Sequence, residues 1–209
     1  MHQVFRKPVL KMLDCSVKWS FNKVLLQTFE GIKIGDMAGF GKPPDLLVRD
    51  RIVAALTLVK KYDTRRFRRL QRRLDYVVNE LCVGTAVYGR HYKDCIVDLT
   101  RFPFEKNEDW YRLVLACTII HEATHGEIEA WGIRYDQEHY LRVERLCYTE
   151  EIRFIRRVWQ EAGYQRFGEF NEDYWLKHFQ AGEGKWQEAF QGGQRGYISK
   201  LIRRFREAR

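Results

Sequence analysis

The stretch "NEDWYRLVLACTIIHEATHG", residues 107–126, has the pattern of one long buried helix. Asn107 is a typical N-cap residue, and Glu108 and Asp109 place negative charge in the first turn, where it suits the helix dipole. Apolar and small residues then recur at steps of three and four, the period of a helix face: Trp110, Leu113, Val114, Cys117, Ile120 and Thr124. We therefore expect a helix that begins after Asn107 and ends near Gly132.

Two histidines lie four residues apart on this helix, and Glu122 directly follows the first of them. Residues i and i+4 share one helix face, so the imidazoles of His121 and His125 can bind one ion at about 2.0–2.1 Å, a distance that suits zinc. A carboxylate beside the metal can accept a proton from the water that the metal acidifies. The pattern predicts a zinc site with His121 and His125 as ligands and Glu122 as the general base.

A zinc site of this kind needs a third protein ligand, and two residues downstream have suitable positions. Eighteen residues separate His125 from Glu144, and thirteen separate it from His139. A helix of ordinary length followed by a tight return allows either residue to reach the metal. Glu144 is favoured because it interrupts a mostly apolar or aromatic helix face, where a buried carboxylate needs a partner.

The string "HEATH", followed by Glu144 after eighteen residues, resembles the gluzincin metallopeptidases. The resemblance covers roughly residues 76–160. It implies a Zn²⁺ cofactor held by His121, His125 and Glu144, with Glu122 as the general base in the hydrolysis of a peptide or protein by a zinc-activated water. It also implies that "DCIVDLT", residues 94–100, is the edge strand that pairs with an extended substrate.

The SprT-type metalloproteases, which act on proteins bound to DNA, are a second resemblance. The resemblance to the SprT-type proteases implies that His139 is the third ligand and that the basic surface binds nucleic acid. Six arginines fall between Arg65 and Arg73 and could contact phosphates, although a solvated face of an amphipathic helix is the commoner meaning of such a cluster. Nucleic acid is therefore an alternative partner that we do not favour, and a zincin without peptidase activity is a third alternative.

Several further side chains near the motif have a candidate role. A tyrosine hydroxyl could stabilise a tetrahedral oxyanion, and of Tyr135, Tyr140 and Tyr148 we name Tyr148 as the candidate. Glu150 or Glu151 could orient a ligating histidine through its free ring nitrogen, although an ion pair with a nearby arginine is the commoner role.

The five cysteines are scattered, odd in number and without a CxxC pair, which excludes a regular disulfide framework and a cysteine-rich zinc module. We expect reduced thiols that lie mostly in the core. Cys117 and Cys147 would lie near the site if the two motif helices pack together, and we interpret both as small buried hydrophobic residues.

Turn signals and periodicity divide the rest of the chain. We expect a helix that begins at Asp50 and breaks near Asp63, strands within residues 76–100 around a turn near Gly89 to Lys93, and a second long helix that ends at Gly163. The predicted fold is α+β: a compact zincin-like domain with helices packed on a small, mostly antiparallel sheet and additional N- and C-terminal helices. Its predicted parts are an N-terminal arm (1–49), the catalytic domain (50–163) and a C-terminal helical extension (164–209).

Composition limits the remaining function classes. With 209 residues and 45% hydrophobic content, the chain is long enough for one well-packed domain. The net charge of +9 suits an acidic partner without identifying it. The longest apolar run, residues 113–120, is far short of the roughly 20 residues of a membrane span, so we expect a soluble, cytoplasmic protein.

Overall fold

The computed structural model describes residues 24–38, 45–82, 84–136, 138–167 and 170–171. The chain divides into two compact units, Met1–Tyr164 and Gln165–Arg209. The predicted helical pieces around residues 174–179 and 198–205, and any helix before residue 24, lie outside the described residues.

The described elements are five strands, four α-helices and two short 3₁₀ helices. The strands are β1 (Leu25–Phe29), β2 (Ile32–Asp36), β3 (Tyr76–Asn79), β4 (Ala86–Gly89) and β5 (Asp94–Val97). The α-helices are α2 (Leu46–Tyr62), α3 (Thr64–Arg73), α4 (Glu108–Ala130) and α5 (Tyr140–Glu161). The 3₁₀ helices are η1 (Leu99–Arg101) and η2 (Tyr164–Phe167).

The strands form one mixed sheet in the order β1-β2-β3-β5-β4. The outer pairs, β1 with β2 and β4 with β5, are antiparallel, whereas β2 with β3 and β3 with β5 are parallel. The α+β class is confirmed, but the sheet is not mostly antiparallel. Every residue of β3 and β5 is buried, and such strands form short apolar runs that carry no signal for the direction of their neighbours.

Two strands of this sheet, β1 and β2, come from the stretch predicted as an N-terminal arm packed on the domain. Helix α2 also begins earlier than predicted. Its N-cap is Asp45, whose side chain accepts a hydrogen bond from the Leu47 amide, so Asp50 lies inside the helix. The predicted break is confirmed: Asp63 ends α2, and its side chain caps α3 by accepting from the Arg66 amide. Asp45 and Asp50 are equally good capping residues, so residue type alone could not choose between them.

The turn predicted near residues 89–93 is confirmed between β4 and β5. The stretch before it holds two strands, β3 and β4, and the edge of the sheet is β4 rather than β5. The prediction that residues 94–100 form the edge strand is therefore wrong. Burial gives the reason: β5 is enclosed by β3 and β4, whereas Val87 of β4 is 37% exposed.

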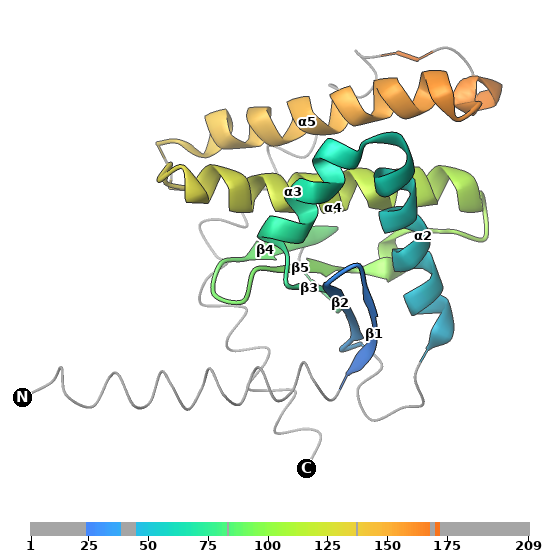
Figure 1. Cartoon of the computed structure of the whole chain (residues 1–209), viewed down its shortest axis with the longest axis horizontal. Helices are drawn as coiled ribbons and strands as arrows, with labels where there is room; N and C mark the ends of the chain where they lie inside the picture. The colour runs from blue at the N-terminus through green and yellow to red at the C-terminus, as the bar shows by residue number, and fades with distance from the viewer. Residues whose placement is uncertain (1–23, 39–44, 83, 137, 168–169, 172–209) are drawn as a thin grey trace, which may run out of the picture. The chain divides into compact units, whose positions relative to one another are not determined.

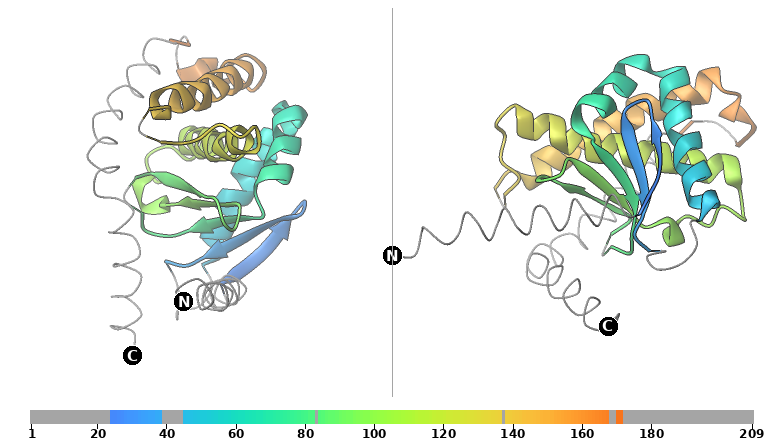
Figure 2. Two further views of the ribbon diagram at one scale, coloured as in Figure 1. Left: turned by 90° about the vertical axis from the view of Figure 1, so that its left-hand side faces the viewer. Right: turned by 60° about the horizontal axis from the view of Figure 1, so that its bottom comes forward.

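Helix α4 lies between the sheet and α5, as Figures 1 and 2 show. Its predicted N-cap is confirmed, since the Asn107 side chain accepts a hydrogen bond from the Trp110 amide. The helix ends at Ala130, and Gly132 then has a positive φ of 76°. Because both long sides of α4 are covered, polar residues at its middle must find partners in α5 or in the sheet.

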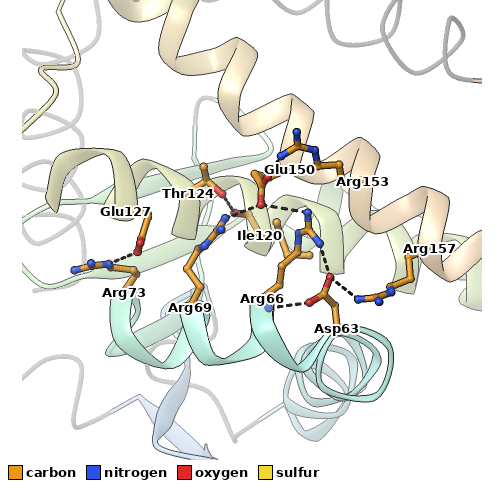
Figure 3. A network of polar contacts seen from close by, with 10 residues as sticks. All are labelled: Asp63, Arg66, Arg69, Arg73, Ile120, Thr124, Glu127, Glu150, Arg153 and Arg157. Atoms are coloured by element: carbon orange, nitrogen blue, oxygen red, sulfur yellow. Dashed lines mark hydrogen bonds and ion pairs between the residues drawn. The ribbon is translucent and has the colours of Figure 1, made fainter. Parts of the chain in front are cut away.

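A network of ion pairs joins α3 to α4 and α5 (Figure 3). Arg66 contacts the buried Asp63 and also Glu150 of α5, at 3.2 Å. Arg69 lies 2.7 Å from Glu150, and Arg73 pairs with Glu127 of α4. Three of the six clustered arginines are thus bound to carboxylates within the fold. The other three, Arg65, Arg68 and Arg72, are exposed.

Within the residues that the structure describes, no helix combines the length and the apolar character needed to cross a bilayer.

Replacing Arg66 by Gln should lower the free energy of unfolding by about 3 kcal/mol, because it leaves the buried Asp63 carboxylate with a weaker set of partners. Asp63 would keep Arg157, whose guanidinium lies 3.3 Å away. The matched control is Arg65→Gln, on the same helix but exposed, for which we expect a change within about 0.5 kcal/mol. Urea denaturation of both variants measures the difference, and equal losses would contradict a structural role for the network.

Candidate metal centre

The three motif residues lie together at the middle of α4. His121 and Glu122 are buried, and His125 is partly exposed. The two imidazole ring centroids are 4.9 Å apart, as expected for neighbours on one helix face. The side of α4 that carries the histidines is covered by α5, whose residues complete the site.

Glu144 of α5 places its carboxylate against both histidines. Its Oε2 lies 3.1 Å from His121 Nε2, and its Oε1 lies 3.4 Å from His125 Nε2. Two atoms that each bind zinc in a tetrahedral site lie about 3.3 Å apart. Moreover, Oε2 of Glu144 is buried and accepts no hydrogen bond. An unsatisfied carboxylate oxygen between two imidazoles fits the donor set of a divalent metal ion.

Glu151 holds His121 from the other side of its ring. Its Oε1 lies 2.5 Å from His121 Nδ1, and both side chains are buried. This contact fixes the orientation of the ring and leaves Nε2 free for a metal, an arrangement that is common around ligating histidines. The expected pairing with arginine is confirmed for Glu150 but wrong for Glu151. The sequence could have indicated that Glu151 and Glu150 have different partners, because Glu151 lies two helical turns after Glu144 and shares its helix face.

Two tyrosines contact the histidine rings. The hydroxyl of Tyr135, in the connection between α4 and α5, donates a hydrogen bond of 2.7 Å to Glu144 Oε1. Its ring meets the His125 ring edge to face, with centroids 5.1 Å apart. The Tyr148 ring lies 5.0 Å from that of His121. Tyr135 therefore positions the third candidate ligand, a role that the sequence did not predict, and the oxyanion role of Tyr148 stays a prediction.

The charges at the centre are strongly coupled. Burial opposes charge on His121, but its close contacts with the carboxylates of Glu144 and Glu151 raise its pKa well above the ordinary value. Burial likewise opposes charge on Glu144, yet the contact with His121 lowers its pKa to about 2. Burial and the nearby charge of His121 lower the pKa of His125 to about 4. The carboxylates of Glu144 and Glu151 thus favour positive charge at this place, and a metal ion would supply it.

Glu122 lies where α4 meets the sheet edge. Burial raises the pKa of its carboxyl to about 7, and a backbone hydrogen bond from Tyr88 of β4 acts in the opposite direction. Gly126 of α4 makes room for the Tyr88 side chain of this strand, because a Cβ there would lie 2.8 Å from the Tyr88 hydroxyl. The candidate general base thus lies beside the edge strand.

His139 is paired with Asp136, whereas Cys147 lies beside the two motif histidines. His139 precedes α5, and its Nδ1 contacts Asp136 at 2.7 Å in a partly exposed pair. Among the described residues, the group with metal-ligand spacing consists of His121, His125 and Cys147, whose ligand atoms lie within 4.8 Å of one another. Cys147 is fully buried, as predicted, but it lies beside the two histidines.

Replacing Tyr135 by Phe should weaken zinc binding about 10- to 100-fold, because the variant loses the hydroxyl that holds Glu144 Oε1. Tyr148→Phe is the matched control, since Tyr148 contacts a histidine ring rather than this carboxylate, and its zinc affinity should match the parent's. Competition with a chromophoric chelator measures both affinities. Unchanged affinity in Tyr135→Phe would remove the positioning role.

Comparison of the chain with protein-family models, with curated proteins and with solved structures finds no match.

Proposed function

We propose that this chain is a zinc-dependent metallopeptidase that hydrolyses peptide bonds, with a fold organised as in the zincins. The observation that supports this most is the Glu144 carboxylate, one oxygen of which lies 3.1 Å from His121 Nε2 and the other 3.4 Å from His125 Nε2. The three residues come from two helices that pack on each other. The proposal includes the cytoplasmic location that the composition favours.

Each side chain of the centre has a defined part in the proposed reaction. His121, His125 and Glu144 hold the metal, while Glu151 and Tyr135 fix two of these ligands in place. When bound, zinc supplies Lewis acidity, which acidifies a water molecule and polarises the substrate carbonyl. Glu122 takes the proton of the attacking water and returns it to the leaving amine.

The edge strand β4 supports a peptide substrate over a small molecule. An extended peptide can add to a free sheet edge through main-chain hydrogen bonds. Within the described part of the chain, strand β4 has no strand paired on its outer side, and it runs beside Glu122. A peptide paired with β4 would therefore pass close to the candidate general base. Val87 is the exposed side chain of this strand.

The SprT-like, nucleic-acid-associated alternative has less support. Its third ligand, His139, is paired with Asp136. Its phosphate-binding cluster is reduced by half, because Arg66, Arg69 and Arg73 are bound to carboxylates of the fold. The third alternative is a zincin that has lost peptidase activity. The activity of the parent protein, measured beside the Glu122 variant, tests it.

Replacing Glu122 by Gln should abolish peptide hydrolysis while zinc content stays at that of the parent, because the amide keeps the shape of the carboxylate but cannot take a proton. Cleavage profiling on a proteome-derived peptide library, together with elemental analysis of the same samples, makes the measurement. A variant as active as the parent would remove the general-base assignment. A parent that binds zinc and cleaves no peptide would identify the inactive alternative.

Replacing Glu144 by Ala should reduce zinc affinity by at least about 10-fold, because a ligand is lost, whereas His139→Ala should leave affinity unchanged. Both substitutions remove one side chain from the same region, so the pair is matched. Zinc titration of the two variants in competition with a chelator measures the effect. The reverse order would give the ligand role to His139 and favour the SprT-like alternative.

A further inference from the structure

Cys147 lies beside the candidate ligands without belonging to the proposed three. It is on α5, one turn after Glu144, and it is fully buried. Its Sγ and one ring nitrogen from each of His121 and His125 lie within 4.8 Å of one another. Glu144, one turn earlier on α5, contacts the same two histidines, so a carboxylate and a thiol of α5 both lie beside them.

Cys147 Sγ lies only slightly farther from the histidine nitrogens than a sulfur ligand of the same zinc ion would. A sulfur and a nitrogen that bind one zinc ion tetrahedrally lie about 3.6 Å apart. The separation in this structure is at most 4.8 Å, so Sγ needs to move by about 1 Å to reach that geometry. Rotation about χ1 of a small side chain such as cysteine provides a movement of this size.

We propose that Cys147 is a fourth protein ligand, which closes the metal site in a resting state of the enzyme. This inference rests on the proposed metal site and adds its regulation. Structural zinc sites have four protein ligands, whereas catalytic sites leave one position to water. The Cys147 thiol releases its proton to solvent when sulfur binds, and water leaves the ion. The reverse exchange, with water and a proton taken up, restores the open site formed by His121, His125 and Glu144.

Location distinguishes Cys147 from the other buried cysteines. Cys117 is also buried and lies one turn before His121 on α4, yet it does not belong to the group with metal-ligand spacing among the described residues. Cys95 lies in the interior strand β5. Cys117 is therefore the matched control for a thiol that is near the centre but does not bind the metal.

Cobalt substitution tests this assignment, because thiolate ligation to Co²⁺ gives an intense near-ultraviolet charge-transfer absorption that imidazole and carboxylate ligands do not give. The full-length parent, Cys147→Ala, Cys147→Ser and Cys117→Ala are loaded with one equivalent of Co²⁺, and bound cobalt is measured by elemental analysis. We expect the absorption in the parent and in Cys117→Ala, and its loss in both Cys147 variants, which still bind one cobalt. Peptide hydrolysis by the Cys147 variants should be several-fold faster than by the parent.

The outcomes separate this proposal from the proposed function. A parent that binds one cobalt without the charge-transfer absorption overturns the Cys147 assignment and leaves the peptidase proposal intact. Cys147 variants that bind no cobalt while remaining folded, as judged by circular dichroism, overturn the idea of an exchangeable fourth ligand and make Cys147 an essential one. A parent that binds no cobalt or zinc overturns both proposals.

Discussion

The contact of the Glu144 carboxylate with His121 and His125 is the interaction on which the α4–α5 pair depends. A buried carboxylate is costly unless it is paired, and Glu144 is only 3% exposed. The fold satisfies it with two imidazoles from α4 and a hydroxyl from the connecting segment. This arrangement leaves one carboxylate oxygen without a hydrogen bond, so the protein interior alone does not complete the set.

Two consecutive glutamates of α5 hold this helix in position, each through a different neighbouring helix. Glu151 contacts His121 within the centre, whereas Glu150 pairs with Arg66 and Arg69 of α3. These two glutamates differ by about 100° around the helix axis, so one helix can satisfy both partners at once. The arginine-rich α3 thereby acts as a brace for the helix that carries the third candidate ligand. Internal ion pairs therefore account for three of the six clustered arginines that suggested nucleic-acid binding.

The predictions that succeeded depend on local signals. The start of α4 follows from the Asn107 cap, and the shared face of His121 and His125 follows from a four-residue interval. The position of Glu144 against the histidines required one added assumption, that consecutive long helices pack antiparallel. The strand order could not be predicted, because parallel pairing of β2, β3 and β5 depends on contacts between distant parts of the chain. The partner of Glu151 was missed because both an arginine and a histidine were chemically suitable.

The positions of Glu144 and Cys147 show why a motif alone does not fix the ligand set of a candidate metal centre. Both residues face α4 from the same side of α5, one helical turn apart, so the helix presents a hard oxygen donor and a soft sulfur donor to the same two histidines. Zinc accepts either donor, whereas magnesium and calcium prefer oxygen. A site that used both donors, as we propose, would favour zinc over the oxygen-preferring ions. In the proposed centre, Glu144 belongs to the open ligand set, and the addition of Cys147 closes it.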